Sequence, residues 1–244
     1  MIFNVKKTLI VGGLLTGLLV AAFTSGFAAA SSKNNPIYKA IRAVFLWQRS
    51  ADISENNHWR TRVDAFSRYK GRPDIVMLGD SLTEHGLWQE LLPETSIINR
   101  GISGDGVDGV LLRIDQIIAT QPRMVFIMLG LNDIRAYTDP DVVAAVYGKI
   151  IERLSPVKEV VVQSTLFTND EADHNAGIKR LNDTLAKLCS SAPNCRFLDL
   201  NAFLSRDGVL LRDFTIDGRH LNGDGYRVWA REIGPLMSAP ETGA

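Results

Sequence analysis

Short apolar runs alternate with longer amphipathic stretches along most of this chain. Each apolar run has the length and composition of a β-strand that is buried on both faces. The runs cover residues 74–78, 96–99, 124–129, 159–164 and 196–200. The amphipathic stretches, which have helical spacing, cover residues 83–92, 106–120, 139–154, 171–190 and 222–237. The alternation predicts an α/β fold, a three-layer α/β/α sandwich of flavodoxin-like type around a five-stranded parallel sheet.

The segment in front of the first strand lies outside this alternation. Lys6 and Lys7 precede an uncharged apolar stretch that ends in an A-x-A sequence, which predicts a signal peptide over residues 1–30 with cleavage before Ser31. About 20 apolar residues also span a bilayer, so an N-terminal membrane anchor is the alternative. Both outcomes place the domain outside the cytoplasm. Cleavage releases it into the periplasm or the medium, and retention leaves it tethered to the membrane.

The remaining chain divides into three parts. Residues 31–70 predict an N-terminal helical extension, and its Trp59 belongs either to the core or to the rim of a site. The domain itself is expected over 71–238, followed by a flexible tail over 239–244.

Charge and cysteine content narrow the class of protein. The 244 residues include 27 basic and 27 acidic side chains without a basic block, which gives no indication of a nucleic-acid partner. Cys189 and Cys195 flank the turn-rich sequence SSAPN, which predicts a small disulfide loop worth about 2 kcal/mol in an oxidising compartment. Two free thiols are the alternative. A metal site is not indicated, because no further Cys or His stands at ligand spacing.

Polar segments follow the predicted strands at the points where ligands bind in parallel sheets. The carboxyl ends of parallel strands meet at one edge, so these segments are expected to converge there. They are GDSL at 79–82, NRGISGDG at 99–106, LGLND at 129–133 and DGRHLN at 217–222. Each could be an ordinary turn by itself, but their joint order is hard to obtain from turn chemistry.

Together these segments resemble the SGNH (GDSL) hydrolase family over roughly residues 72–237. The GDSL block is literal, the glycine of the second block matches Gly101, and residues 130–133 and 217–220 match the G-x-N-D and D-x-x-H blocks. The G-x-S-x-G elbow of the α/β-hydrolases is absent from the sequence. The resemblance implies a serine hydrolase that needs no metal or organic cofactor.

The residue types fit nucleophilic catalysis. A serine hydroxyl such as that of Ser81 is a weak nucleophile until a base removes its proton, and His220 is the predicted base. Asp217 is expected to accept from the other ring nitrogen and to stabilise the imidazolium. By the resemblance, the oxyanion is held by the backbone N–H groups of Ser81 and Gly101 and by the side-chain amide of Asn132.

Other polar residues near these blocks receive a structural interpretation. Asp80 and Asp133 are expected to hydrogen-bond neighbouring loops rather than to act as catalytic acids. Arg100 and Asp105 either shape the pocket or are solvated loop charges. The histidines without a partner pattern are interpreted as surface or packing residues: His58, His85 and His174.

The substrate is inferred from resemblance alone. Residues 79–114 look most like the branch that contains platelet-activating-factor acetylhydrolase-type and sugar O-acetylesterase proteins. This implies hydrolysis of short acyl esters, with O-acetylated carbohydrate of the cell envelope as the expected substrate. Candidate pocket residues are Trp88, Leu131 and Phe167. A broader thioesterase or lysophospholipase is one alternative, and a non-catalytic glycan-binding protein on this fold is another.

Overall fold

The computed structural model describes residues 55–68 and 71–237. The predicted leader over 1–30 and the tail over 239–244 lie outside these residues, as does most of the predicted extension. All elements given below belong to one compact unit that begins at Asn56.

The centre of this unit is a five-stranded, fully parallel sheet, which confirms the predicted fold class. The strand order is β2-β1-β3-β4-β5. The strands are β1 (Ile75–Gly79), β2 (Ile97–Gly101), β3 (Met124–Met128), β4 (Glu159–Gln163) and β5 (Cys195–Leu198). Every residue of β1 and β3 is buried, because helices cover both faces of the sheet at its centre.

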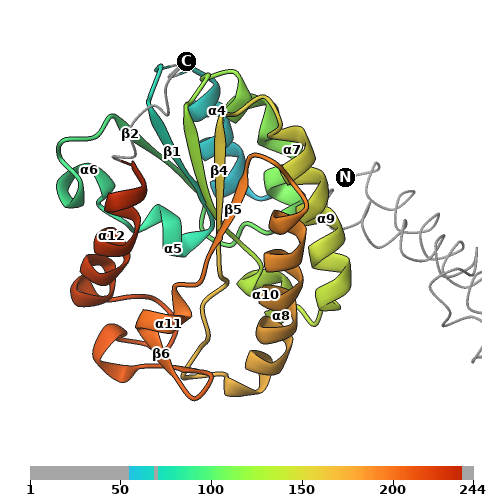
Figure 1. Cartoon of the computed structure of the whole chain (residues 1–244), viewed down its shortest axis with the longest axis vertical. Helices are drawn as coiled ribbons and strands as arrows, with labels where there is room; N and C mark the ends of the chain where they lie inside the picture. The colour runs from blue at the N-terminus through green and yellow to red at the C-terminus, as the bar shows by residue number, and fades with distance from the viewer. Residues whose placement is uncertain (1–54, 69–70, 238–244) are drawn as a thin grey trace, which may run out of the picture. The chain divides into compact units, whose positions relative to one another are not determined.

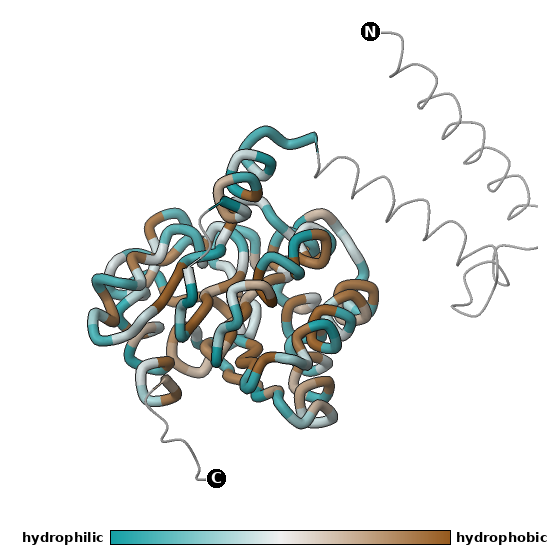
Figure 2. Tube along the Cα trace, turned by 90° about the horizontal axis from the view of Figure 1, so that it is seen from above, coloured by the Kyte–Doolittle hydropathy of each residue, from teal (hydrophilic) through white to brown (hydrophobic). Residues whose placement is uncertain are grey.

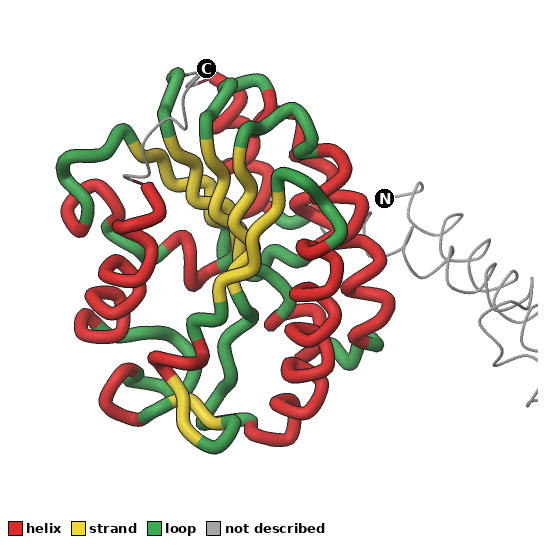
Figure 3. Tube along the Cα trace, in the orientation of Figure 1, coloured by secondary structure: helices red, strands yellow, loops and turns green. Residues whose placement is uncertain are grey.

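Helices form the two outer layers (Figures 1 and 3). One layer contains α4, α7, α9 and α10, which contact one another in this order, and the other contains α6, α11 and α12. Their bounds are α4 (Asn57–Arg68), α6 (Trp88–Leu91), α7 (Val107–Ile118), α9 (Pro140–Arg153), α10 (Asn175–Ser190), α11 (Asn201–Leu204) and α12 (Gly223–Met237). Figure 2 shows hydrophobic and hydrophilic positions alternating along these helices, as expected when one helix face packs on the sheet.

The predicted helix over 83–92 is wrong in one respect, because the chain forms α5 (Ser81–Glu84) and then α6 with a break between them. The Trp88 indole folds back over Gly86, where a Cβ would lie 2.3 Å from the ring. Its Nε1 donates a hydrogen bond to the Thr83 carbonyl at 2.9 Å. The side chain therefore occupies the space and the acceptor that a continuous helix would use.

Several short elements escaped prediction because they are too short for a periodic pattern. They are α8 (Leu131–Arg135), the 3₁₀ turn η2 (Arg212–Phe214), α11, and the hairpin of β6 (Ser205–Arg206) with β7 (Val209–Leu210). Of these elements, α8 follows the carboxyl end of β3, and α11 follows that of β5. In Figure 1 the carboxyl ends of the strands point toward α5, α8 and α11. The stretch predicted as a helix over 171–190 begins instead with a 3₁₀ turn, η1 (Ala172–His174), and becomes α-helical at Asn175.

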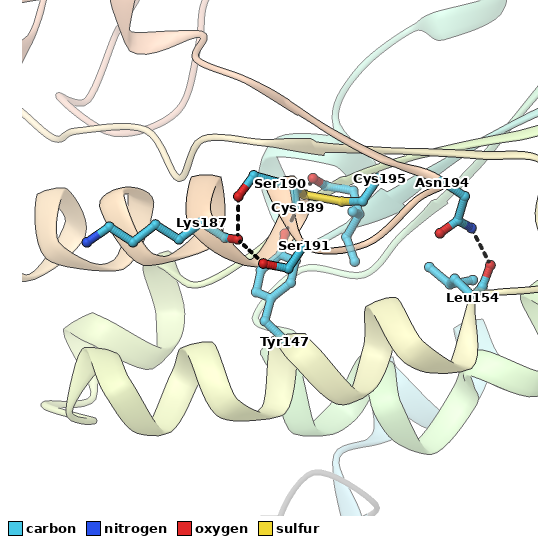
Figure 4. The surroundings of a disulfide bond; sticks show 9 residues. Tyr147, Leu154, Lys187, Cys189, Ser190, Ser191, Asn194 and Cys195 are labelled. Carbon is cyan, nitrogen blue, oxygen red and sulfur yellow. Dashed lines mark hydrogen bonds between the residues drawn. A yellow bond between two sulfur atoms is a disulfide. The ribbon is translucent and has the colours of Figure 1, made fainter.

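The predicted disulfide is present between Cys189 and Cys195, with an S–S distance of 2.06 Å (Figure 4). It joins the end of α10 to the start of β5. Asn194, inside the loop that it closes, donates to the carbonyls of Leu154 at 3.2 Å and Val157 at 2.8 Å. The loop is thus held covalently to α10 and by hydrogen bonds to the end of α9.

Within residues 55–68 and 71–237, every helix is too short or too polar to cross a bilayer.

Candidate active site

The turn from β1 into α5 presents Ser81 at the carboxyl edge of the sheet. Asp80 caps the helix, since its Oδ1 accepts from the Leu82 N–H at 3.0 Å. Gly79 makes the turn sterically feasible, because a Cβ there would lie 2.5 Å from the Met128 carbonyl of the neighbouring strand. As the first residue of α5, Ser81 has a backbone N–H that no earlier helical carbonyl can accept.

Three side chains from distant parts of the sequence form a line at this edge. Ser81 Oγ lies 3.0 Å from His220 Nε2, although 139 positions separate the two residues. His220 Nδ1 lies 2.7 Å from Asp217 Oδ2. The structure therefore brings together the predicted nucleophile, base and orienting acid with the contacts that a serine hydrolase requires.

Asp217 stays ionised because of the bonds that it receives. Partial burial pulls the pKa of its carboxyl upward, but hydrogen bonds from the side chain and backbone of His220 and from the Arg219 N–H outweigh this and hold the pKa at about 2. An ionised carboxylate at this position selects the His220 tautomer whose Nε2 accepts from the serine.

The loop that carries Asp217 and His220 is fixed from two sides. Thr215 Oγ1 donates to the His220 carbonyl at 2.7 Å and accepts from the Gly218 N–H at 2.9 Å. Gly218 has φ of +83°, and a Cβ there would lie 2.7 Å from the backbone nitrogen of Asp170. Glycine is required here both for its left-handed backbone and for this close approach.

Asn132 reaches the same edge from α8. Gly130, with φ of +112°, makes the turn from β3 into this helix. The Asn132 side-chain Nδ2 donates to the Asp105 carbonyl at 2.9 Å and lies 3.5 Å from Asp80 Oδ2. The amide is therefore oriented by the loop after β2, with its longer, weaker contact on the residue next to Ser81.

The geometry does not favour Gly101 as the predicted oxyanion donor. Its N–H already donates to Asn99 Oδ1 at 2.8 Å. The residue is buried, and a Cβ would lie 2.2 Å from the Glu84 backbone nitrogen. The absence of a side chain at Gly101 serves the packing of β2 against α5.

Gly104, which was not among the residues predicted from the sequence, has the properties that Gly101 lacks. It is exposed, has φ of +79°, and a Cβ there would have no atom within 4 Å. Its N–H has no hydrogen-bond partner within the described ranges 55–68 and 71–237. Its neighbours Ser103 and Asp105 are bonded to Glu84 and Asn132, so the Gly104 peptide lies between α5 and α8. The repeated glycines of NRGISGDG were the available signal, but spacing alone did not distinguish them.

A buried ionic network supports this side of the site. Arg113 Nε lies 2.9 Å from Asp105 Oδ2, and both side chains are fully buried. Arg113 also donates to the carbonyls of Gly79 at 3.2 Å and Arg100 at 2.9 Å. Asp105 and Arg113 thus tie the loop after β2 to the end of β1, and Asp105 is not a solvated loop charge.

Asp80 and Asp133 are also buried and bond to nearby backbone, as predicted. Asp133 Oδ2 accepts from the Val107 N–H at 3.2 Å, at the start of α7. Burial raises the pKa of Asp80 to about 7, and the nearby charges of Asp105 and Asp133 add to this effect. Neither carboxyl contacts Ser81 Oγ or His220 in the hydrogen bonds described.

The candidate pocket residues have different environments. Trp88 is 2% exposed and packs edge-on against Trp229 with ring centroids 4.8 Å apart, so the prediction that it lines the leaving-group side is not supported. Leu131 is 4% exposed. Phe167 is partly exposed and is the candidate with the most accessible surface. His85, interpreted from the sequence as a surface or packing residue, is exposed, and its ring centroid lies 5.3 Å from that of His220.

One polar hollow borders the loop that carries Asp217, and a second shares Asp170 with it. The first has a volume of 450 Å³ and is lined by Asn169, Asp170, Arg212, Thr215, Ile216, Asp217 and Gly218. The second has a volume of 620 Å³ and is lined by Arg135, Tyr137, Asp170, Glu171, Asp173 and His174. Tyr137 and Ile216 at their edges are 88% and 90% exposed. Throughout the described ranges, no cluster of His, Cys, Asp and Glu has a metal-binding arrangement.

Comparison with known proteins identifies the family. Residues 77–228 match the profile of the GDSL-like lipase/acylhydrolase family, and this is more than half of the 244-residue chain. The chain therefore belongs to the GDSL-like lipase/acylhydrolase family, and it is a carboxylic ester hydrolase.

Individual relatives agree with this assignment. Human platelet-activating factor acetylhydrolase IB subunit alpha1 is 27% identical over 202 residues, which cover 76% of this chain and 85% of that protein. The structure of a GDSL-like lipase from Bacteroides thetaiotaomicron superposes with a TM-score of 0.62 at 20% identity, covering 72% of this chain and 96% of that one. For an acetylxylan esterase from Geobacillus stearothermophilus the TM-score is 0.56 at 20% identity, covering 70% and 96%. At these identities the two structures show a shared fold alone.

Proposed function

We propose that this protein is a serine esterase that cleaves short acyl esters through an acyl-enzyme on Ser81. The observation that carries the proposal is the continuous contact from Ser81 Oγ to His220 at 3.0 Å and from His220 to Asp217 at 2.7 Å. A non-catalytic role on this fold gives no reason for that alignment.

The proposed reaction has two halves. His220 Nε2 takes the Ser81 proton while Oγ attacks the ester carbonyl, and the imidazolium then protonates the departing alcohol. Water attacks the acyl-enzyme in the second half, and His220 again serves as base and then returns the proton to Ser81. Asp217 remains ionised throughout and stabilises the imidazolium.

The oxyanion receives its hydrogen bonds from the backbone of Ser81, the backbone of Gly104 and the side-chain amide of Asn132. Gly104 replaces Gly101 in this assignment because its N–H is unused among the described residues and its surroundings are open. The hydrogen bond from each such donor becomes stronger as the carbonyl oxygen gains charge. It therefore stabilises the transition state more than the ground state and lowers the barrier.

O-acetylated carbohydrate is the proposed substrate class. The hollow beside Asp217 and the hollow that shares Asp170 with it are lined mainly by charged and polar side chains, which suits a hydroxyl-rich alcohol moiety. A hollow with several apolar residues, Ile151, Leu188, Ala192 and Pro193 among them, lies between α9 and α10, beside the disulfide loop. The names of two relatives, an acetylhydrolase and an acetylxylan esterase, point to acetyl groups as well.

Export is part of the proposal. The disulfide between Cys189 and Cys195 supports an oxidising compartment, the periplasm or the cell exterior. The apolar stretch after Lys6 and Lys7 supports delivery there, either by a cleaved signal peptide or by an anchor.

A substrate panel tests the proposal. Wild type and Ser81→Ala are assayed with p-nitrophenyl esters from acetyl to octanoyl and with acetylated xylo-oligosaccharides. A steep fall in kcat/KM with acyl length supports the short-chain esterase, whereas a rise supports the thioesterase or lysophospholipase alternative. Failure of a fluorophosphonate probe to label Ser81 in folded protein would support the non-catalytic alternative.

A further inference from the structure

Helix α4 precedes the segment that matches the family profile, yet it packs directly behind the site. The profile begins at residue 77, whereas α4 covers Asn57–Arg68. The Phe66 ring lies beneath two guanidinium groups, with centroid distances of 4.5 Å to Arg100 Cζ and 4.8 Å to Arg62 Cζ. A Cβ at Gly109 would lie within 4 Å of both Trp59 Nε1 and Asp105 Oδ1, so the indole reaches the buried network.

Glu84 connects this helix to the loop after β2. Its Oε2 accepts hydrogen bonds from both the backbone N–H and the hydroxyl of Ser103, the former at 2.7 Å. From α4, Arg62 Nε lies 3.0 Å from Glu84 Oε1, and His58 Nε2 lies 3.2 Å from Glu84 Oε2. The Glu84 side chain is only 14% exposed, so these partners replace most of its water.

The position of Glu84 makes this contact relevant to catalysis. It stands three residues after Ser81 on α5, and Ser103 directly precedes Gly104. The far end of the same loop is held at Asp105, whose carbonyl accepts from Asn132 and whose carboxylate pairs with Arg113. The Gly104 peptide therefore lies between two anchors, Ser103 and Asp105, each of which is held by hydrogen bonds to other segments.

Anchors are needed at this place because the glycine itself provides none. Gly104 is exposed, has no side chain to pack, and a Cβ there would meet no atom within 4 Å. A hydrogen-bond donor accelerates acyl transfer only when it is already directed at the oxyanion before the reaction. The bonds to Ser103 are the contacts that fix the peptide on the α5 side.

We infer that Glu84 is a positioning residue that sets the direction of the Gly104 N–H, and that α4 takes part in catalysis by holding Glu84 through Arg62 and His58. This inference rests on the proposed esterase activity. It extends the catalytic unit at least to residue 58, in front of the region that matches the family.

The test compares four single variants of the full-length protein. Glu84→Ala removes the acceptor of both Ser103 hydrogen bonds. Ser103→Ala removes one of these two hydrogen bonds, and Arg62→Met removes the ion pair between α4 and Glu84. Arg60→Met is the matched control, because Arg60 is exposed on the same helix and makes no side-chain contact described for residues 55–68 and 71–237. The readouts are kcat and KM for p-nitrophenyl acetate, the inhibition constant of phenylboronic acid, and the Tm.

The expected result is a loss of transition-state stabilisation without a loss of substrate binding. Removal of one oxyanion donor costs about 10²–10³ in kcat, so misdirection of one by Glu84→Ala should cost at least tenfold. Ser103→Ala and Arg62→Met should each cost about threefold, Arg60→Met nothing, and KM should stay within twofold of wild type. Phenylboronic acid forms a tetrahedral anion on Ser81, so its inhibition constant should rise by the same factors as kcat falls.

Three outcomes oppose the inference or its premise. The inference is overturned if kcat in Ser103→Ala and Arg62→Met equals that of Arg60→Met, even if Glu84→Ala fails to fold. It is also overturned if kcat falls while boronate inhibition is unchanged, because the role of Glu84 is then not at the oxyanion. An inactive wild type that is not labelled by fluorophosphonate refutes the proposed function instead.

Discussion

The two sides of the candidate site are built in opposite ways. The nucleophile side, which consists of the β1–α5 turn, residues 102–105 and α8, rests on the fully buried pair of Arg113 and Asp105. The base side, residues 215–222, is a loop in which the side chains of His220 and Asp217 are 31% and 48% exposed. One side is part of the core, and the other is held at the surface by short hydrogen bonds.

This difference separates stability from catalysis. A change to the buried Arg113–Asp105 pair on the nucleophile side disturbs groups that cannot regain water, so it should alter both the free energy of unfolding and the rate. A change on the base side removes a group that water can replace, so it should alter the rate alone. The predictions that follow test this contrast, from the largest expected effect to the smallest.

Ser81→Ala should have the largest effect on rate. Removal of the hydroxyl leaves no nucleophile, and comparable triads lose about 10⁶ in kcat. The Oγ contributes one hydrogen bond, to His220, so the free energy of unfolding should change by less than about 1 kcal/mol. Turnover of p-nitrophenyl acetate and a urea titration measure the two quantities. Residual turnover near the wild-type rate would place the nucleophile elsewhere.

Asp217→Asn should lower kcat by about 10³–10⁴ because the amide favours the wrong His220 tautomer. Its exposure predicts a change in the free energy of unfolding of no more than about 1 kcal/mol at pH 7. The measurement is the same pair of assays. A large loss of stability here would contradict the view that the base side is energetically separate from the core.

Arg113→Met should reduce the free energy of unfolding by about 3–5 kcal/mol, because it leaves the Asp105 carboxylate buried without its cation. It should also lower kcat, because the loop that carries Gly104 loses an anchor. Urea denaturation at pH 7 gives the first quantity. The exposed pair of Lys179 and Asp183 on α10 offers the control, and Lys179→Met should cost less than about 1 kcal/mol.

Asp80→Asn should change how stability depends on pH. Burial raises the pKa of Asp80 from its ordinary value of 3.8 to about 7, so the folded protein retains this proton between about pH 4 and 7 while the unfolded chain releases it. The contribution of Asp80 is therefore fully present below pH 4 and is lost as the pH rises through 7. Between pH 4 and pH 8, the free energy of unfolding of the variant should rise by about 1–3 kcal/mol relative to that of wild type. Parallel pH profiles of the two proteins would contradict this.

The fold could be predicted because its signals are local. Each strand is a short apolar run, and the long helices α7, α9, α10 and α12 carry a clear 3.6-residue period. The prediction failed at 83–92, where a single indole turning back over Gly86 interrupts the helix. No periodic pattern records a contact of that kind.

The site could be predicted in part for the same reason. Ser81, Asn132, Asp217 and His220 lie in recognisable blocks, and the parallel sheet brings those blocks to one edge. The choice between Gly101 and Gly104 could not be made from spacing, because it depends on which N–H is already bonded. The roles of Trp88 in the core and of Glu84 beside α4 depend likewise on contacts between distant segments.

The sequence by itself determined the succession of strands and long helices along the chain, the disulfide pair and the residue types that a serine esterase needs. Tertiary structure alone decided which N–H groups remain free, which carboxylates are buried and which helix supports the loop after β2. The physical reason is that element type follows from the periodicity of neighbouring residues, whereas burial, pKa and donor direction depend on atoms that meet only after the chain has folded.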